Sequence, residues 1–297
     1  MSGTMIYDTA IIGAGPAGLT AALQLKRYGI SALLFEARVV GGLLHNANLV
    51  ENYPGFPGGI PGFELVRRFT EQIMRAGVQV TLGEVARLDH DGTVFNLQTQ
   101  RNTYLALTAV LAAGTKPVTF PRAMIPEEVQ ERVCYEVYPL RELQGGRVVI
   151  VGAGDAAFDY ALNLARYNQV LVLNRSDSLK CLPLLWERTQ AETNIVYHPF
   201  TRATRLSRRP DGGLLIGTTG LEGDDQLQAD YLIGALGRMP RLDLLSGLAE
   251  MKNLESEGRL HVIGDIQRGI YRQTAIAVGD GMLAAMKIYQ YLSAIRS

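Results

Sequence analysis

The sequence has few cysteines and no excess of charge of either sign. Its 297 residues include two cysteines, Cys134 and Cys181, which are too few for a disulfide scaffold and predict a reducing compartment. Lysine and arginine together number 29, as do aspartate and glutamate, so the formal net charge is zero. This balance argues against a nucleic acid as the main partner, because binding a polyanion requires a basic surface.

The sequence also has no long apolar run, no leader-like N-terminus and few histidines. No stretch reaches the roughly 20 apolar residues that a membrane-spanning helix needs. Residues 1–5 lack a basic segment and a cleavage site, so no secretory signal peptide is predicted. The four histidines show no metal-ligand spacing. We therefore expect a cytoplasmic protein with no membrane association and no metal site.

Two segments of the chain have the same pattern. Residues 7–13 and 146–152 are each an apolar, β-branched run that ends in glycine and leads into an Ala/Leu-rich helical pattern. A second apolar strand follows each helix, at residues 32–36 and 170–174. Each segment therefore has the strand–helix–strand order of a nucleotide-binding βαβ unit. Because the length also suggests two domains, the sequence predicts an α/β protein with two Rossmann-like dinucleotide-binding domains.

Two clusters of breaker residues predict how these domains are connected. Residues 112–117 and 234–240 contain glycine and proline and are typical of crossing points between domains. We expect the first domain to comprise residues 1–115 and 240–297, with the second domain, residues 116–239, inserted into it. The elements predicted for the first domain are a helix at 64–76, strands within 78–100 and at 105–113, a short strand at 259–263 and a helix at about 271–294.

The segment from Gly13 to Gly18 joins the first strand to its helix. Such a turn holds a dinucleotide pyrophosphate, because N–H groups at a helix N-terminus attract anions and glycines allow close approach. Gly13 makes the tight turn, Gly15 admits the phosphate and Gly18 lets the helix pack on the strand. Glu36 ends the next strand, at the spacing of about 20 residues where an acid accepts hydrogen bonds from the ribose. Together these features predict a dinucleotide site.

The second glycine turn, residues 152–157, has the same form but a different residue after its second strand. Arg175 stands where the first unit has Glu36. An arginine at this position disfavours NAD and can accommodate the 2′-phosphate of NADP. Lys180 is close enough in sequence to assist, whereas Asp177 opposes an anion. The second turn therefore predicts either a nucleotide site or a fold that is kept for structure alone.

Further motifs follow in the order and spacing of a known family. Residues 41–44 and 50–55 are similar to the flavin-side segment GGQL…VENxPG. Gly264-Asp265 is similar to the family's second FAD motif, and residues 270–273 are similar to its IYRQ segment. With the first glycine turn, these motifs make the chain resemble the low-molecular-weight thioredoxin reductases over nearly its whole length. The resemblance implies FAD, two Rossmann-like domains, a homodimer and a small redox protein, thioredoxin or ferredoxin, as a possible partner.

The resemblance also assigns residues to the cofactors. It implies that Asp265 binds the ribityl chain and that Arg272 and Gln273 lie beside the isoalloxazine ring. The expected FAD contacts are Gly13, Gly15, Pro16, Ala17, Glu36, Ala37, Gly42, Leu43, Leu44, Asn52, Gly114, Gly264, Asp265, Arg272, Gln273 and Thr274. The expected contacts of a second nucleotide are Gly152, Gly154, Asp155, Ala156 and Arg175.

The chain departs from the family at two places. The family's CxxC carries over to Tyr135 and Tyr138, so the active-site disulfide is absent from its usual place. The family's NADPH loop, HRRDxFRA, is similar to residues 174–181, in which Arg175 is kept and the other two arginines are Ser176 and Lys180. Reduction of thioredoxin by the usual route and the use of NADPH are therefore both open questions.

Two relatives of that family also lack the CxxC. The thioredoxin-reductase-like ferredoxin–NADP⁺ reductases have a hydrophobic-His-Tyr-x-Val segment, which residues 133–137 resemble with Cys134 in the histidine place. Their usual C-terminal extension has no counterpart here. The cyanobacterial diflavin-linked disulfide oxidoreductases have a second FAD at the pyridine-nucleotide site and a disulfide elsewhere. The changed NADPH loop and the two cysteines outside a CxxC fit this second group.

Cys134 and Cys181 both flank the second nucleotide site. They fit either a redox pair, which requires Cα atoms within about 7 Å, or two buried apolar thiols. As a redox pair they would receive reducing equivalents from the flavin and pass them to a partner disulfide. The first interpretation is thus an FAD-dependent disulfide oxidoreductase that uses these cysteines, with a second FAD or NADP at the Gly152/Gly154 site. A ferredoxin–NADP reductase-like enzyme and a non-catalytic flavin-binding redox sensor are the alternatives.

A basic run follows the second βαβ unit. Arg202 and Arg205 are followed closely by Arg208 and Arg209. Such a run is either a solvated face or a docking surface for an acidic ferredoxin.

Overall fold

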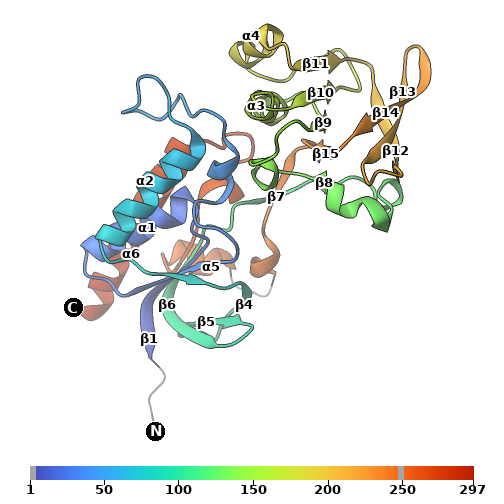
Figure 1. Cartoon of the computed structure of the whole chain (residues 1–297). Helices are drawn as coiled ribbons and strands as arrows, with labels where there is room; N and C mark the ends of the chain where they lie inside the picture. Colours follow the sequence, from blue (N-terminus) through green and yellow to red (C-terminus); the bar gives the residue numbers. More distant parts are fainter. Residues whose placement is uncertain (1–4, 247–250) are drawn as a thin grey trace. The chain divides into compact units, whose positions relative to one another are not determined.

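The computed structural model describes residues 5–246 and 251–297, which form two units (Figure 1). Residues 1–4 and 247–250, which fall within the two segments predicted for the first domain, lie outside the described residues. Unit 1 comprises Met1–His45, Val50–Lys116 and Met239–Ser297, and unit 2 comprises Asn46–Leu49 and Pro117–Arg238. Each unit contains a parallel sheet with helices, which confirms the predicted α/β class with two Rossmann-like units.

Unit 1 is built on one mainly parallel sheet. Its strand order is β3-β2-β1-β6-β5-β4, and β17 pairs with β6. The pairs among β3, β2, β1, β6 and β17 are parallel, whereas β5 and β4 continue the sheet in antiparallel fashion. The bounds are β1 (Ile6–Ile12), β2 (Ala32–Glu36), β3 (Val80–Leu82), β4 (Val85–His90), β5 (Phe95–Thr99), β6 (Thr103–Leu111) and β17 (Leu260–Val262).

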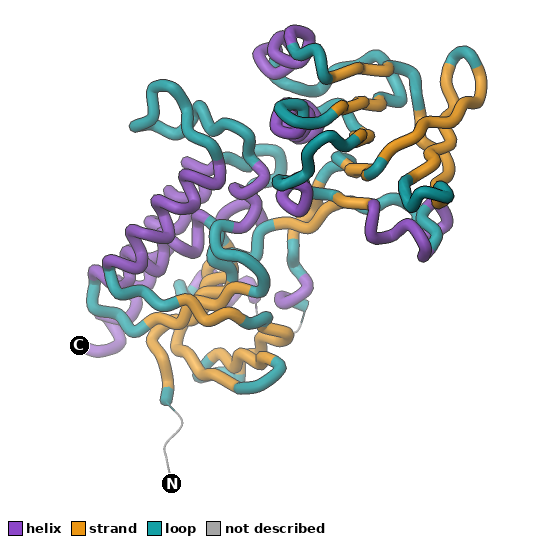
Figure 2. The backbone as a smooth tube through the Cα atoms, in the orientation of Figure 1, coloured by secondary structure: helices purple, strands orange, loops and turns teal. Residues whose placement is uncertain are grey.

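The alternation of side chains along β1 places apolar residues on both faces of this sheet. Ile11 packs into a core with residues of α1 and α6, whereas Ala10 and Ile12 face a second core with the β4–β5 hairpin. In Figure 2 the three long helices of unit 1 lie alongside one another on one side of the sheet. The helices of unit 1 are α1 (Pro16–Arg27), α2 (Gly62–Arg75), α5 (Met251–Ser256) and α6 (Thr274–Arg296).

Unit 2 has a parallel sheet with the order β11-β10-β9-β15-β8 and a separate antiparallel sheet of β12, β13 and β14. The helix α3 follows β9, as α1 follows β1 in unit 1. The strand bounds are β8 (Val133–Cys134), β9 (Arg147–Val151), β10 (Gln169–Leu173), β11 (Ile195–His198), β12 (Arg202–Arg208), β13 (Leu214–Gly220), β14 (Gly223–Ala229) and β15 (Tyr231–Gly234). The helix bounds are α3 (Asp155–Leu164) and α4 (Pro183–Ala191).

The two connections between the units are short strands that pair with each other. They are β7 (Thr115–Pro117) and β16 (Arg238–Pro240). Gly114 precedes β7 with φ of 64°, and its carbonyl accepts a hydrogen bond from the N–H of Arg241 at 3.1 Å. The chain therefore leaves unit 1 and returns to it at adjacent points.

Most predicted elements of unit 1 are present with small shifts. The helix predicted at 64–76 is α2, and the helix predicted at about 271–294 is α6. The strand predicted within 78–100 is three strands, because turns at Gly83 and Gly92 interrupt it. Among the described residues, no helix has both the length and the apolar character needed to cross a membrane.

Candidate nucleotide-binding sites

The first glycine turn joins β1 to α1 in a shape that requires glycine. Gly13 has φ of 104°, and a Cβ there would clash with the carbonyl oxygen of Ala112. A Cβ on Gly18 would clash with the carbonyl oxygen of Gly13, because α1 packs directly on the turn. Gly15 caps α1, and no atom lies within 4 Å of its Cβ position, which leaves room for a pyrophosphate. The first turn of α1 contributes two other predicted contacts, Pro16 and Ala17.

The carboxylate of Glu36 lies against this turn. Its Oε2 accepts a hydrogen bond from the N–H of Ala14 at 2.8 Å, and its Oε1 accepts one from the N–H of Arg38 at 2.9 Å. The predicted contact Ala37 lies between Glu36 and Arg38 in the chain. A ribose bound beside the turn would present its hydroxyls to this acceptor. The structure therefore brings together the turn and the acid that the sequence pattern paired.

The predicted flavin-side segment packs on the same turn. The N–H of Gly41 donates to the carbonyl of Ala14 at 2.8 Å. The next residue begins the 3-10 helix η1 (Gly42–Asn46), and its Cβ position lies 3.6 Å from the Cα of Gly15. The segment contributes the predicted contacts Gly42, Leu43 and Leu44. The segment therefore lies beside Gly15, the residue that caps α1.

Two predicted contacts from distant parts of the chain meet in unit 1. The Nδ2 of Asn52 donates to the Oε1 of Gln273 at 2.8 Å. Gln273 caps the N-terminus of α6, which begins at Thr274 and follows Arg272 directly. The positive end of the α6 dipole therefore lies beside this amide pair. The arrangement can hold a polar ring edge with amide and backbone groups.

Gly264 and Asp265 form a tight turn on the start of α1. Gly264 has φ of 74°, and its Cβ position lies 3.0 Å from the Cβ of Ala17. The pair opens the 3-10 helix η6 (Gly264–Ile266), directly after β17. The predicted ribityl contact Asp265 is thus in the same part of unit 1 as the first glycine turn.

A buried acid on α6 holds the turn of Gly264, and the sequence analysis missed it. The Oδ2 of Asp280 accepts hydrogen bonds from the N–H of Gly264 at 3.1 Å and from the Nε of Arg268 at 2.8 Å. Asp280 is only 7% exposed and also pairs with the second guanidinium nitrogen of Arg268. The signal that could have revealed it is an acid between two glycines, Gly279 and Gly281, in an otherwise apolar helix.

The second glycine turn repeats the geometry of the first in unit 2. Gly152 has φ of 140°, and a Cβ there would clash with the carbonyl oxygen of Ala235. Gly154 caps α3, and no atom lies within 4 Å of its Cβ position. Ala157, which replaces the third glycine, is fully buried. The predicted contacts at the start of α3 are Gly154, Asp155 and Ala156.

The loop after β10 folds back onto this second turn. The N–H of Lys180 donates to the carbonyl of Ala153 at 2.9 Å, and the carboxylate of Asp155 accepts from the N–H of Leu182 at 2.7 Å. Asp155 therefore anchors the loop. Arg175, at the start of the same loop, is exposed and makes no hydrogen bond or ion pair among the described residues. Lys180 and Arg175 thus lie at different ends of the loop.

Tyr135 and Tyr138 occupy the sequence positions of the family's CxxC. The hydroxyl of Tyr135 accepts a hydrogen bond from the N–H of Phe120 at 3.1 Å, and its ring would clash with a Cβ on Gly234. The guanidinium of Arg141 lies 4.5 Å from the ring centroid of Tyr138. Both tyrosines therefore pack within unit 2, and no thiol is present at either position.

The two cysteines are free thiols in unit 2. Cys134 is on β8, the edge strand, and Cys181 is on the loop after β10. Lys180, next to Cys181, bridges to Gly154 after β9, and both cysteines pack against the same apolar core. A disulfide needs Cα atoms within about 7 Å. The two thiols form no disulfide in the described chain, and their role as a redox pair stays a prediction.

The environment of each thiol also lowers its reactivity. Burial raises the pKa of Cys134, and burial together with the nearby charge of Asp155 raises the pKa of Cys181. A thiol with a raised pKa is largely protonated near neutral pH and is a poor nucleophile. Both cysteines pack against the apolar core of unit 2.

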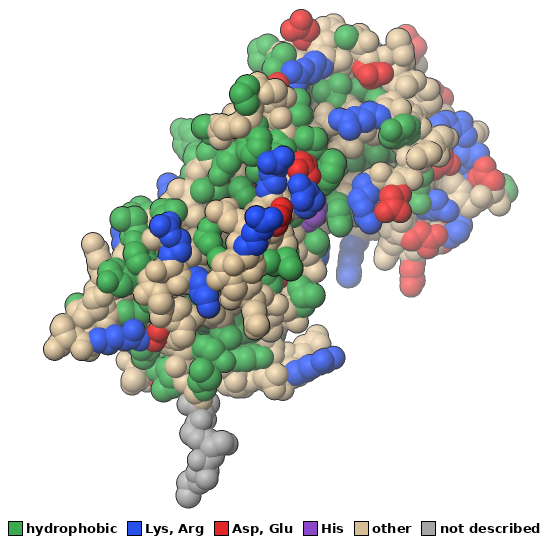
Figure 3. Space-filling view, turned by 60° about the vertical axis from the view of Figure 1, so that its left-hand side comes forward, with side chains coloured by type: hydrophobic (Ala, Val, Ile, Leu, Met, Phe, Trp, Pro, Cys, Tyr) green, Lys and Arg blue, Asp and Glu red, His purple; other side chains and the backbone are tan. Residues whose placement is uncertain are grey.

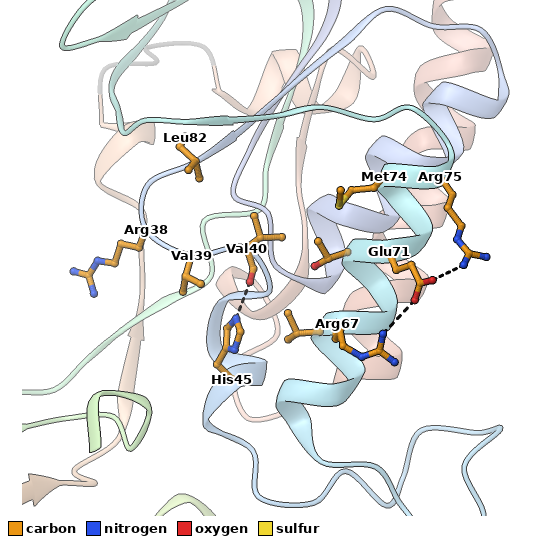
Figure 4. A pocket seen from close by; sticks show the side chains of 11 residues that line it. Arg38, Val39, Val40, His45, Arg67, Glu71, Met74, Arg75 and Leu82 are labelled. Carbon is orange, nitrogen blue, oxygen red and sulfur yellow. Dashed lines mark hydrogen bonds and ion pairs between the residues drawn. The ribbon is translucent and has the colours of Figure 1, made fainter. Parts of the chain in front are cut away.

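A groove of about 640 Å³ on unit 1 lies between the loop after β2 and α2. In Figure 4 the side chain of His45 points toward Val40, whose carbonyl it contacts through Nε2 at 2.8 Å. On the other side, Glu71 pairs with Arg67 and Arg75 along α2. The groove holds no predicted cofactor contact. Among the described residues, no group of three or more His, Cys, Asp or Glu side chains could hold a metal ion.

Comparisons with known proteins cover nearly the whole chain. A family model described as pyridine nucleotide-disulphide oxidoreductase matches residues 7–281. The chain is 30% identical to NADPH-dependent thioredoxin reductase 3 of Arabidopsis thaliana over 98% of its own length, and it spans 59% of that relative. It is 28% identical to the thioredoxin reductase of Mycolicibacterium smegmatis, covering 97% of each chain. The crystal structure of Lactococcus lactis thioredoxin reductase matches with a TM-score of 0.86 at 25% identity, covering 97% of this chain and 99% of that one.

Proposed function

The chain belongs to the pyridine nucleotide-disulphide oxidoreductase family as a thioredoxin reductase-like flavoprotein, and from this premise we propose that unit 1 holds FAD and unit 2 holds NADP(H). Unit 1 is then a discontinuous FAD-binding domain and unit 2 an inserted second nucleotide-binding domain. The enzyme acts in the cytoplasm, on an external disulfide acceptor. In the net reaction, NADPH and one proton reduce the disulfide to two thiols and leave NADP⁺.

The observation that carries the FAD assignment is the arrangement around the first glycine turn. Gly15 and the start of α1 offer N–H groups to a pyrophosphate, and Glu36 lies within hydrogen-bonding reach of the same turn. The pair of Asn52 and Gln273 supplies amide groups for the polar edge of a ring. Bound FAD supplies two-electron acceptance and donation, and the protein binds and orients it.

The residue after β10 supports NADP(H) over a second FAD in unit 2. FAD and NAD both present a ribose with free hydroxyls, which an acid such as Glu36 accepts. Unit 2 has Arg175 instead, which suits a phosphate on that ribose. The open position beside Gly154 accommodates the pyrophosphate.

The tyrosines and the free cysteines support transfer without an internal dithiol. No thiol is present at Tyr135 or Tyr138, and Cys134 and Cys181 are free thiols on different elements. With FAD bound, the acceptor disulfide would be reduced without a thiol of this chain as an intermediate.

We also propose that the chain forms a homodimer through unit 1. Large apolar side chains are exposed on both α2 and α6, among them Phe63, Met74, Leu283 and Met286. In Figure 3 apolar side chains are spread between charged ones over the visible face of unit 1, without a continuous surface of one charge. Covering exposed apolar surface by a second copy is favourable. Light scattering of the purified protein, with an expected mass of twice 32.5 kDa, tests this proposal.

Paired glycine variants test which nucleotide each unit binds. Gly15→Ala and Gly154→Ala each add a methyl group where no protein atom lies within 4 Å, so the fold should tolerate both. We expect Gly15→Ala to weaken FAD binding and leave NADP⁺ binding intact, and Gly154→Ala to do the reverse. Flavin released by denaturation is counted per chain, and anaerobic titration with NADPH follows bleaching of the flavin band.

The outcomes separate the alternatives. One flavin per chain and prompt bleaching by NADPH support the proposal. Two flavins per chain, the second lost in Gly154→Ala, would replace it with a diflavin enzyme. Reoxidation by oxidised ferredoxin but by no disulfide would indicate a ferredoxin–NADP reductase-like enzyme. If NADPH, ferredoxin and disulfides all leave the flavin unchanged, the chain is a non-catalytic flavin sensor.

A further inference from the structure

A polar pocket of about 430 Å³ in unit 2 lies where the loop after β10 meets the start of β12. The glycine-turn pattern covers only its Arg175 side, because β12 follows the whole βαβ unit. The residues that line it are Arg175, Phe200, Arg202, Thr219, Gly220 and Leu221. Two arginines therefore line one pocket, one from each side of the junction.

Backbone hydrogen bonds fix the two arginines beside each other. The N–H of Thr201 donates to the carbonyl of Asn174 at 2.8 Å, which places the residues before Arg202 and Arg175 side by side. The N–H of Phe200 donates to the carbonyl of Ser176 at 3.4 Å. Phe200 has φ of 51°, the one positive value at a non-glycine residue within the described chain, and it turns the chain sharply from β11 into β12. The juxtaposition of the arginines is thus a property of the fold.

Neither guanidinium has a partner in the described part of the chain. No hydrogen bond, ion pair or ring contact involves the side chain of Arg175 or Arg202. Nearby arginines differ, because Arg208 pairs with Glu131 at 3.3 Å and Arg209 pairs with Asp211. Two unneutralised cations that share a pocket repel each other and favour an anion between them.

No acidic residue is among the described residues that line the pocket. The hydroxyl of Thr219, a lining residue, donates to the carboxylate of Asp224 on the neighbouring strand β14. Asp224 itself is not a lining residue. The pocket therefore has the composition of an anion site.

We propose that Arg175 and Arg202 together bind the 2′-phosphate of NADP(H), and that Arg202 is a specificity-determining residue outside the nucleotide-binding loop. This inference rests on the proposed nucleotide site in unit 2. Arg175 occupies the position that faces the ribose, and Arg202 lines the same pocket. Of the two further positions that are arginine in the family's loop, one is Ser176. The other is Lys180, which does not line this pocket and whose N–H donates to the carbonyl of Ala153.

The test compares ligands with and without the phosphate on the FAD-loaded protein. Dissociation constants for 2′,5′-ADP, 5′-AMP, NADP⁺ and NAD⁺ are measured by calorimetry for the unaltered protein, Arg202→Gln and Arg175→Gln. A charge-assisted contact to phosphate predicts at least a tenfold loss of affinity for 2′,5′-ADP and NADP⁺ in each variant. Affinity for 5′-AMP and NAD⁺, which lack the phosphate, should change by less than about twofold.

Arg205→Gln is the matched control. Arg205 is an exposed arginine on the same strand and does not line the pocket. Arg205→Gln should change the dissociation constants of ligands with and without the phosphate by less than twofold. The flavin content and melting temperature of every variant should match those of the unaltered protein. In steady-state kinetics we expect Arg202→Gln to raise the KM for NADPH and to leave kcat unchanged.

Three results would overturn the inference, and they are distinguishable. If Arg202→Gln binds NADP⁺ as tightly as the unaltered protein does, Arg202 has no role while the nucleotide site stands. If it weakens NAD⁺ and NADP⁺ equally, its role is structural. If the unaltered protein with one FAD per chain binds neither 2′,5′-ADP nor NADP⁺, the proposed NADP(H) site itself fails.

Discussion

The two βαβ units of this chain share a backbone and differ at the residues that surround the ligand position. In both, a glycine with positive φ packs on a neighbouring strand, and a second glycine caps a helix beside open space. In unit 1 the next strand ends in Glu36, which is held by two backbone N–H groups. In unit 2 it is followed by Arg175, which has no partner among the described residues and lies beside Arg202.

This difference shows that the glycine turn and the residue after the second strand recognise different parts of a dinucleotide. The turn recognises what all dinucleotides share, a pyrophosphate, and its geometry is nearly the same in both units. The residue after the second strand responds to what distinguishes them, the substituents of the ribose. The same backbone can therefore bind two different cofactors when the side chain after the second strand is basic instead of acidic.

The largest expected difference between the two units is at the third small residue of each glycine turn. Gly18→Ala places a Cβ against the carbonyl oxygen of Gly13, whereas unit 2 already has alanine at Ala157. We expect Gly18→Ala to lose FAD and to lower the free energy of unfolding by about 3 kcal/mol, the upper range for overpacking. Ala157→Gly, the control, should cost about 1 kcal/mol. Urea unfolding with flavin counting measures both, and equal costs would contradict the argument.

Glu36→Gln tests the acid of unit 1 with a smaller expected effect. The amide keeps the shape but replaces one acceptor with a donor, so the N–H of Ala14 or Arg38 and a ribose hydroxyl lose a charged acceptor. A hydrogen bond to a charged group contributes about 1.5–3 kcal/mol, which predicts a rise of roughly 10–100-fold in the dissociation constant of FAD. Fluorescence titration of the apoprotein measures it. An unchanged constant would mean that Glu36 serves only the turn.

Asp280→Asn tests the buried acid that holds the turn of Gly264 in unit 1. The substitution removes the ion pair with Arg268 and weakens the hydrogen bond to the N–H of Gly264. Arg268 is 40% exposed, so solvent screening limits the loss to about 1–2 kcal/mol, less than for a fully buried pair. Asp243→Asn, which breaks an exposed pair with Lys116, should cost less than Asp280→Asn, because solvent screens the exposed pair. Thermal unfolding measures the loss of stability in both variants. A larger loss in Asp243→Asn than in Asp280→Asn would contradict a role of Asp280 in positioning the turn of Gly264.

The double variant Cys134→Ser/Cys181→Ser should have the smallest effect. Because both thiols are free and burial raises the pKa of each, we expect NADPH-dependent activity to stay within about twofold. Denatured, air-oxidised protein should show two free thiols. Burial raises the pKa of both cysteines, so alkylation of the native protein should be slow at neutral pH and accelerate as the pH rises. Loss of activity in the double variant would restore the cysteine route.

The parts of the fold that the sequence predicts well are local. A β-branched run, a glycine turn and a helical pattern lie within a few tens of residues, and their geometry depends on that segment alone. This is why β1 with α1 and β9 with α3 occur where the pattern expects them. The antiparallel sheet of β12 to β14 was not predicted, because its strands carry many polar and charged residues and only one side is buried.

The contacts that complete each site are long-range and leave no periodic trace. Asn52 meets Gln273, and Asp280 meets Gly264, only because the sheet and α6 bring them together. Cys134 and Cys181 both flank the second glycine turn in sequence and are free thiols on different elements, so their role as a redox pair stays a prediction. In the sequence Arg202 is only one residue of a basic run, and its position beside Arg175 follows from the backbone contacts between the loop after β10 and the start of β12.

The paired connectors β7 and β16 have a consequence for the history and engineering of the chain. Because the two crossing strands lie side by side, unit 1 could be closed by a turn of a few residues, and unit 2 is contiguous apart from the short segment Asn46–Leu49. A domain inserted at such a junction can be gained, lost or exchanged without a change in the sheet of unit 1. Replacing residues 117–238 with the equivalent domain of a relative would transfer that relative's cofactor preference in one step.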